Sequence, residues 1–376
     1  MGDRSSIRLA RRIIRVISRI PAWYRRLWDE QNLPLSVRRV IAARRSIRFC
    51  QSCLNDPVAR FAIILRRYEL EKPLMVAIDR ERRRIKVRGI ELMFGHGRNV
   101  LFSRLCALLP VVVGAPLDYL RLVAEISDGE DSGPGLVSFC SRHPGAVLIP
   151  DEFFVHSRGY ENLRRIAQLN RTVWSERSDR ILWRGTSSGF ETISKQALSI
   201  DDHELIARVR FCLTLKDTPG IDVKLCNVLP SHDRALHEER FAKAGIFGEY
   251  VPPLAWCGHK FAIDIDGNTN AFSNFFTRLL MGCCVLKIAS PAGYRQWYYG
   301  EIEPWTHYVP VKADFSDVLE KIAWCRANHD QCEQIAARGQ AFAMARDFDS
   351  EMASAIRRVC EAYENGKLHH ATFRKL

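Results

Sequence analysis

The chain has 376 residues, of which 47% are hydrophobic and 26% are charged. This length suits two domains better than one, and the composition excludes a disordered or fibrous protein. The net charge is +13, but residues 1–50 alone hold 13 arginines and three acidic residues. Because the positive charge is concentrated at one end and not spread over a folded face, we do not expect nucleic acid to be the partner.

Residues 7–28 predict a basic amphipathic helix. Branched apolar residues recur at helical spacing, arginines occupy the other faces, and Trp23, Tyr24 and Trp28 lie close by. Such a segment suits an anionic membrane surface, and packing on the body of the protein is the alternative. We expect neither a spanning helix, which needs about 20 apolar residues, nor a signal peptide.

The 12 cysteines have no spacing typical of a disulfide framework. A reducing compartment is therefore expected. Together with the basic helix, this predicts a cytoplasmic protein that lies peripherally on the inner face of the cytoplasmic membrane.

Residues 54–125 predict mixed α/β structure, and residues 146–150 predict a short buried strand. Polar residues follow that strand directly: Asp151, Glu152 and His156. Because α/β folds place their sites beyond the carboxyl ends of strands, these three residues are the first candidate site. The alternative for Asp151 is a helix or turn cap.

A second strand is predicted over Ile181–Trp183, followed by a small hydroxyl-rich loop, Arg184–Gly189. Arginine suits the forked recognition of phosphate, and the small residues Gly185, Thr186 and Ser187 leave room for a ligand. A solvent-facing arginine at a strand end is the alternative.

The most informative stretch begins with a strand pattern over Phe261–Ile265. A polar turn follows at Asp266–Asn270, then an amphipathic run to Met281 and a second buried strand, Cys284–Ile288. Strand, turn, helix and strand form the βαβ unit of a parallel sheet. Its turn presents free N–H groups at a helix N-terminus, which suits a phosphate.

Three helices are predicted after this unit. They cover Ser316–Asn328, about 330–345 and Ser350–Glu364, with Ser316 and Ser350 as N-caps.

Four blocks of sequence carry a family resemblance: Pro150–Phe154, Trp183–Thr186, Lys260–Thr269 and Gly282–Val318. The last two are specific together, because Asp-Gly-Asn-Thr is followed at a fixed distance by Pro304-Trp305 and by His307–Val311. Over about residues 145–345 the chain resembles glycosyltransferase family 90. This family includes the Rumi-like protein O-glucosyltransferases and bacterial lipopolysaccharide-modifying transferases.

The resemblance implies an α/β protein of the GT-B type, with two Rossmann-like domains facing across a cleft. Residues 1–50 would be the basic extension, 51–172 the acceptor-side domain and 173–345 the nucleotide-sugar domain. Residues 346–376 would form a C-terminal helix that packs back on the first domain. Transfer would be inverting and independent of a metal cofactor, with a nucleotide sugar, usually a UDP-sugar, as donor.

Two departures from the eukaryotic branch favour the bacterial branch, whose acceptor is a glycolipid. His156 and Gly159 occupy the positions where that branch has an Asn-x-x-Asp segment containing the catalytic base. Asn274 occupies the position of an arginine in the helix after the turn, and Arg278, one turn later, is the expected substitute.

Inverting transfer needs a base near the acceptor oxygen and positive charge near the leaving diphosphate. Asp151 is the first candidate for the base, and His156 and Glu152 are its rivals. The expected donor-binding residues are Arg184, Gly185, Thr186, Ser187, Lys260, Asp266, Gly267, Asn268, Thr269, Asn270, Ser273 and Arg278.

The sequence therefore predicts a glycosyltransferase that acts on lipopolysaccharide or another surface glycan. The alternatives are a protein O-glycosyltransferase of the Rumi type and a non-catalytic relative that binds nucleotide or nucleic acid.

Overall fold

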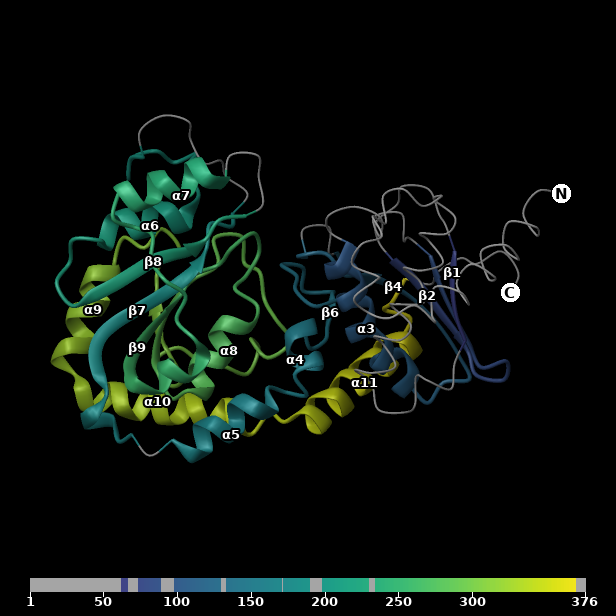
Figure 1. Cartoon of the computed structure of the whole chain (residues 1–376). Coiled ribbons are helices and arrows are strands. Elements are labelled where there is room, and N and C mark those ends of the chain that lie inside the picture. The colour runs from purple at the N-terminus through teal and green to yellow at the C-terminus, as the bar shows by residue number, and fades with distance from the viewer. Residues whose placement is uncertain are drawn as a thin grey trace, which may run out of the picture. The chain divides into compact units, whose positions relative to one another are not determined.

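The computed structural model describes residues 62–66, 74–88, 98–129, 133–170, 172–189, 198–229 and 234–369 (Figure 1). The expected basic helix at 7–28 lies outside these residues. The chain divides into two compact units, Met1–Ala124 with His370–Leu376, and Glu125–His369. Each unit holds strands and helices, so the α/β class is confirmed. The domain boundaries at 50, 172 and 345, and the facing of two domains across a cleft, stay predictions.

The first unit is built on a mixed sheet in the order β1-β3-β2-β4. Its strands are β1 (Ala62–Arg66), β2 (Leu74–Asp79), β3 (Arg84–Arg88) and β4 (Tyr119–Glu125). β1 pairs with β3 in parallel, whereas β2 pairs with β3 and β4 antiparallel. The helix α3 (Arg98–Gly114) is buried along Leu105–Val112 apart from the half-buried Pro110, as its run of apolar residues requires.

The second unit holds a parallel sheet in the order β11-β10-β9-β7-β8. The strands are β7 (Ser178–Thr186), β8 (Ile221–Asn227), β9 (His259–Asp264), β10 (Cys284–Ile288) and β11 (Val309–Val311). The chain first builds outward from β7 to β8 and then returns to build outward from β9. Doubly wound sheets bind their ligands at such a reversal, beyond the carboxyl ends of the two strands.

Helices cover both faces of this sheet, because alternate strand residues are apolar on both sides. One face packs Trp183 and Phe261 with α6 (Ala207–Leu215), α7 (Arg234–Lys243) and α9 (Val318–Ala327). The other face packs Leu182 and Ala262 with α5 (Glu161–Leu169), α8 (Ser273–Leu280) and the short helix η6 (Pro253–Gly258).

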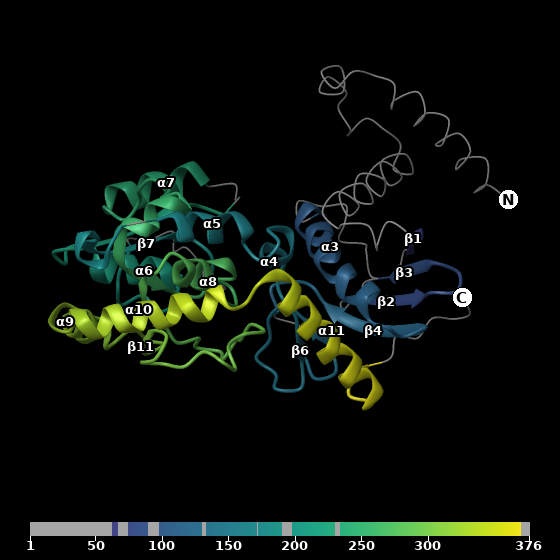
Figure 2. The ribbon, with the colours of Figure 1, turned by 90° about the horizontal axis from the view of Figure 1, so that it is seen from below.

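The remaining elements of the second unit are smaller or lie toward the C-terminus. Two short strands, β5 (Val137–Ser138) and β6 (Val147–Leu148), pair in parallel, and α4 (Glu152–His156) follows them. The short helix η5 (Trp174–Glu176) precedes β7. The long helices α10 (His329–Met344) and α11 (Phe348–Glu364) end the described chain, and α11 contacts β6 (Figure 2).

The three predicted C-terminal helices are confirmed, but their predicted caps are wrong. Asp317 precedes α9, and the side chain of Asp347 accepts the N–H of Ser350 at the start of α11. At α9 the aspartate directly after Ser316 takes the cap position, and at α11 the aspartate three residues before Ser350 takes it. Aspartate and serine both cap helices well, so the residue types alone do not decide between them. Among the described residues, no helix is long and apolar enough to cross a membrane.

Candidate functional site

The carboxyl ends of β7 and β9 are joined by Arg208, which lies on α6 and is 5% exposed. Its Nε and Nη2 donate to the carbonyl oxygens of Asp266 and Ile265 at 3.0 and 2.9 Å. Its Nη1 donates to the carbonyl of Thr186 at 3.1 Å and to Ser188 Oγ at 2.7 Å. Burial lowers the pKa of this guanidinium. Arg208 is not among the site residues predicted from the sequence, where its local signal is a charged residue between the apolar positions Ile206 and Val209.

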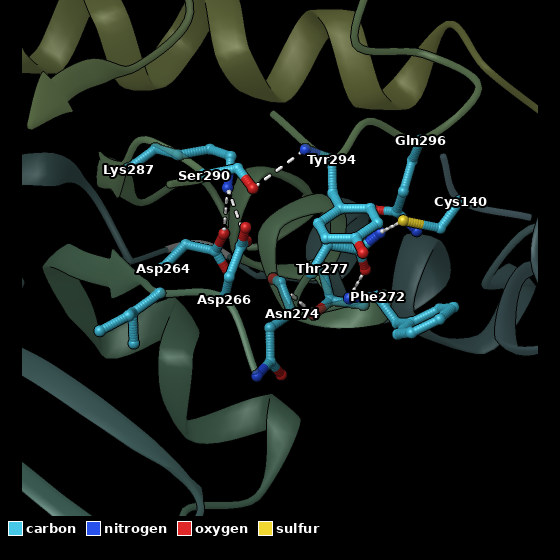
Figure 3. A network of polar contacts seen from close by, with 12 residues as sticks. Cys140, Asp264, Asp266, Phe272, Asn274, Thr277, Lys287, Ser290, Tyr294 and Gln296 are labelled. Atoms are coloured by element: carbon cyan, nitrogen blue, oxygen red, sulfur yellow. Dashed lines mark hydrogen bonds and ion pairs between the residues drawn. The ribbon is translucent and has the colours of Figure 1, made fainter. Parts of the chain in front are cut away.

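The turn after β9 is held in shape by its own side chains. Asn268 Nδ2 donates to Asp128 Oδ2 at 3.0 Å, and the Thr269 hydroxyl donates to the Asp128 carbonyl. Asn270 Nδ2 donates to Cys140 Sγ at 2.7 Å, and Asn270 Oδ1 accepts the Phe272 N–H (Figure 3).

The side chains of this turn therefore make hydrogen bonds within the protein, whereas several of its backbone N–H groups do not. Within the described part of the chain, the backbone N–H groups of Asn268, Thr269 and Asn270 donate to no protein acceptor. Thr269 and Asn270 are buried, so their N–H groups have little access to water. Unpaired N–H groups ahead of a helix, here α8, make the turn suitable for an anion.

Next to the turn lies a buried charge network. Lys287 Nζ lies 2.7 Å from Asp264 Oδ2 and 3.7 Å from Asp266 Oδ1 (Figure 3). Burial raises the pKa of Asp266. Burial alone would lower the pKa of Lys287, but the two carboxylates outweigh it and the pKa is raised. The network fixes the direction in which the chain leaves β9.

Arg278, on α8, is a buried cation without an acceptor. It is 7% exposed, and its guanidinium lies 3.5 Å from the ring centroid of Trp256. Within the described residues it makes no hydrogen bond and no ion pair, and burial lowers its pKa to about 10. An unpaired buried charge is costly, so this position favours an anion that arrives from outside the protein.

Arg184, in contrast, is used inside the protein. Its Nη2 donates to Asp222 Oδ2 at 2.9 Å, and its other N–H groups donate to the carbonyls of Trp183, Asp222 and Glu249. The predicted loop is wrong at its start, since residues 184–186 continue β7. One N–H donor of the five is left over, so the phosphate-binding role of Arg184 stays a prediction with little support from the geometry.

The other predicted donor-binding residues are divided by position. Thr186 and Ser187 lie at the end of β7, and Ser273 begins α8 near the turn. Gly185 lies against the Trp183 ring, which a Cβ atom would meet at 2.4 Å. Lys260 is not brought to the site: it lies at the amino end of β9, and its Nζ pairs with Asp179 at 2.7 Å.

On the acceptor side, Asp151 is the N-cap of α4. Its Oδ1 accepts the Phe154 N–H at 3.0 Å, its Oδ2 accepts Gln296 Nε2 at 2.7 Å, and the residue is 0% exposed. This geometry favours the capping alternative, and a role as base stays a prediction. Glu152 is buried at the start of α4, and His156 is half-buried at its end.

An aromatic pair that the sequence reasoning did not single out lies beside both candidate sites. Phe153, which is 46% exposed, meets Phe272 edge to face with ring centroids 6.2 Å apart. Phe272 has a φ of 46° and a ψ of −111°, which is a strained conformation for an aromatic residue. Strain of this kind clusters at functional sites, and here it separates the turn from α8.

Residues 157–352, just over half of the chain, match the family described as glycosyl transferase family 90. The chain belongs to this family. The predicted resemblance is thereby confirmed, while the bacterial branch stays a prediction. The family match begins after Asp151, Glu152 and His156, so it does not reach the predicted base.

Individual relatives match parts of the family 90 chain. Human "Protein O-glucosyltransferase 3" is 28% identical over 240 residues, which are 62% of this chain and 41% of that protein. "Uncharacterized protein 179R" of Invertebrate iridescent virus 6 is 28% identical over 184 residues, 46% of this chain and 15% of that protein. The chain therefore spans less than half the length of these relatives.

Solved structures give weaker likenesses. A glycosyltransferase from Rickettsia africae has a TM-score of 0.36 at 11% identity, covering 54% of this chain and 55% of that one. Anabaena Alr3699/HepE in complex with UDP-glucose has a TM-score of 0.32 at 13% identity, covering 55% and 52%. Values this low are not evidence of a shared architecture.

Proposed function

We propose that this family 90 chain is an inverting, metal-independent glycosyltransferase whose donor is a nucleotide sugar, most simply a UDP-sugar. The observation that carries the proposal is the turn Asp266–Asn270, with unpaired backbone N–H groups at the strand-order reversal of a parallel sheet. A diphosphate fits this position by charge and by geometry.

Departure of the nucleoside diphosphate leaves negative charge on its terminal phosphate. The N–H groups of the turn and the guanidinium of Arg278 are the groups that would stabilise it, and both are already in place without a ligand. Preorganised donors of this kind stabilise a developing negative charge more strongly in a site that excludes water. Arg208 would act one step away, by holding the two strand ends at a fixed separation.

The acceptor hydroxyl needs a base, and the segment 151–156 offers Asp151, Glu152 and His156. The carboxylate of Asp151 is buried and accepts hydrogen bonds from Gln296 and Phe154, so the acceptor hydroxyl would have to reach one of its remaining lone pairs. His156 lies half-buried at the other end of α4 and does not cap the helix. We keep Asp151 as the first candidate and His156 as its strongest rival.

For the acceptor we propose lipopolysaccharide or another lipid-linked surface glycan, met at the inner face of the cytoplasmic membrane. The support is the arginine-rich pattern of residues 7–28. Each basic residue near an anionic surface contributes about 1 kcal/mol, so several would give reversible docking. A chain without residues 1–30 should lose its salt-sensitive binding to anionic vesicles. Undiminished binding to the vesicles would contradict the proposed role of residues 7–28 in membrane binding.

A second candidate is transfer to a protein hydroxyl. It is favoured by the relatives named protein O-glucosyltransferases, which match up to 62% of this chain. A lipid-linked saccharide and a folded protein acceptor, offered with the same radiolabelled donor, distinguish the two candidates by which one becomes labelled.

The central test is release of nucleoside diphosphate from UDP-, GDP-, ADP- and CMP-sugars. We expect slow hydrolysis of one donor, and a loss of about 100-fold in Arg278→Leu, which is the scale seen when one charge-stabilising donor is removed. Arg338→Leu is the matched control, since Arg338 is exposed on α10. Absence of hydrolysis and of thermal stabilisation by every nucleotide would contradict the proposed function.

A further inference from the structure

The second unit contains a cavity of about 390 Å³ that lies apart from the predicted donor residues. Its walls come from the segment 144–148, from residues 295–300 and from α11. A volume of this size is within the range of small-ligand sites. Apolar surface from Val147, Leu148 and Trp297 forms part of the wall.

The charged groups around this cavity are mostly positive. Of the described residues that line it, Arg295, Arg358 and Lys367 are cationic and one, Glu361, is a carboxylate. The imbalance favours an anionic ligand over a neutral one.

Arg358 is the cation with unmet hydrogen-bonding capacity. Its Nη1 donates to Ser354 Oγ at 3.1 Å, but Nε and Nη2 are buried and have no acceptor among the described residues. No described carboxylate lies within ion-pairing distance of it; Glu351 and Glu301 act only at longer range. Nε–H and Nη2–H lie on the same edge of a guanidinium, which is the edge that holds a carboxylate or phosphate with two parallel hydrogen bonds.

The cavity is connected to the donor turn by a short chain of contacts. Arg295 pairs through its backbone with Ser141, at 2.9 and 3.1 Å, and the neighbouring Cys140 accepts the side chain of Asn270. Gln296, which also lines the cavity, donates to Asp151. These contacts link the cavity wall, through Arg295 and Gln296, to the turn and to the segment that holds the candidate bases.

From these contacts we propose that the cavity binds the oxyanion of an anionic saccharide, a sugar phosphate or a sugar carboxylate, through the Nε–Nη2 edge of Arg358. The proposal rests on the proposed function in one respect, because it takes the bound saccharide to be part of the glycosyltransferase's acceptor. The sugar ring packs on the apolar wall around Trp297, and Arg295 and Lys367 supply further positive charge. Acceptors without a nearby anionic group are disfavoured, because the buried edge of Arg358 stays unpaired.

The test is calorimetric binding of glucose 6-phosphate, glucuronate and glucose to the full chain. We expect one or both of the anionic sugars to bind and glucose not to bind. The two anionic probes distinguish phosphate from carboxylate, and inorganic phosphate reports how much the sugar ring contributes. We expect Arg358→Met to weaken binding at least 10-fold. Arg358→Lys should recover only part of this loss, because lysine keeps the charge but not the fork.

Arg357→Met is the matched control, since Arg357 is the neighbouring arginine on the exposed face of α11. It should bind the probes like the wild type. Equal binding by Arg358→Met and wild type, binding of glucose as tight as that of the anionic sugars, or no binding of either anionic probe would overturn the proposal. Because the probes are not donors, anion binding without any cleavage of nucleotide sugars would uphold the cavity and contradict only the proposed function.

Discussion

A helix on each face of the parallel sheet carries a buried arginine, and these two arginines differ in their hydrogen-bond acceptors. Arg208, on α6, donates to three carbonyl oxygens and a hydroxyl at the ends of β7 and β9. Arg278, on α8, lies over the face of Trp256 and makes no hydrogen bond or ion pair within the described part of the chain. Burial lowers the pKa of both, so burial alone does not distinguish them. The difference lies in the acceptors: Arg208 stabilises the fold, whereas Arg278 has its hydrogen bonds available for a ligand.

The largest effect that this comparison predicts is on stability at Arg208. Arg208→Met should lower the free energy of unfolding by about 3–5 kcal/mol, because it leaves several buried carbonyl oxygens without donors. Urea unfolding followed by tryptophan fluorescence measures the change. The same variant should lose nucleotide binding, since Asp266 and Thr186 are no longer held together.

Arg210→Met is the control on the same helix, because Arg210 is only half-buried and donates to one carbonyl, that of Leu205. It should cost about 1 kcal/mol. Equal losses in the two variants would mean that the strand ends do not depend on Arg208.

The second prediction compares Arg278 with Arg184. Arg278→Leu should leave stability within about 1 kcal/mol of the wild type, because it removes an unpaired buried charge together with one cation–π contact. Arg184→Leu should cost about 2–3 kcal/mol, because the Asp222 carboxylate and three carbonyl oxygens lose their donor. A large loss of stability in Arg278→Leu would show that Arg278 is structural, and would weaken its proposed contact with the diphosphate.

The βαβ unit could be predicted from the sequence, but the roles of the arginines could not. The strand Cys284–Ile288 is as predicted, and the helix at 271–281 is observed as α8, because apolar periodicity and a polar turn are local signals. Whether the N–H donors of an arginine already have acceptors depends on residues far away in sequence, such as Asp222 for Arg184 and Asp266 for Arg208. No local pattern contains that information.

The same limit explains Asp151 and Lys260. Asp151 was placed correctly after a short strand, but its partner Gln296 lies 145 residues away. Lys260 belongs to the same sequence block as the turn, yet β9 separates the two, since a strand of six residues spans about 20 Å. Two residues that are close in a sequence motif can lie far apart in space, and an extended strand separates them more than any other element of the same length.

A third prediction concerns the space around the turn. A Cβ atom at Gly267 would lie 2.6 Å from Ser188 Oγ and 3.2 Å from Arg208 Nη2. Gly267→Ala should therefore shift the turn and lower donor hydrolysis by about 10-fold, a change of 1.4 kcal/mol in transition-state stabilisation. Its effect on stability should be smaller than that of Arg208→Met.

Gly258→Ala is the matched control for this substitution, because a Cβ atom there meets nothing within 4 Å. It should hydrolyse donor like the wild type. If Gly267→Ala is also fully active, the turn does not need its present shape, and the N–H groups of residues 268–270 are not the diphosphate site.

The smallest predicted effect is on the pH dependence of stability at Asp222. Burial would raise the pKa of this carboxyl, but the hydrogen bond and charge of Arg184, together with the charges of Lys224 and Arg180, outweigh it, so the pKa lies below its ordinary value of 3.8. Because the pKa is lower in the folded state than in the unfolded state, the carboxylate stabilises the fold. Its contribution to the free energy of unfolding is complete above pH 3.8 and is lost as the pH falls through the folded-state pKa.

Arg184→Met should therefore lose about 1 kcal/mol of this pH-dependent stability, so that its difference from wild type shrinks between pH 5 and pH 2. Arg180→Met is the control, because Arg180 lies 3.6 Å from the same carboxylate but is mostly exposed and screened by solvent. Urea unfolding at several pH values measures both curves. A difference between Arg184→Met and wild type that stays constant down to pH 2 would assign the role of Arg184 to its carbonyl acceptors and not to Asp222. Arg184 would then resemble Arg208 still more closely, and both would differ from Arg278, which makes no hydrogen bond with the residues that the structure describes.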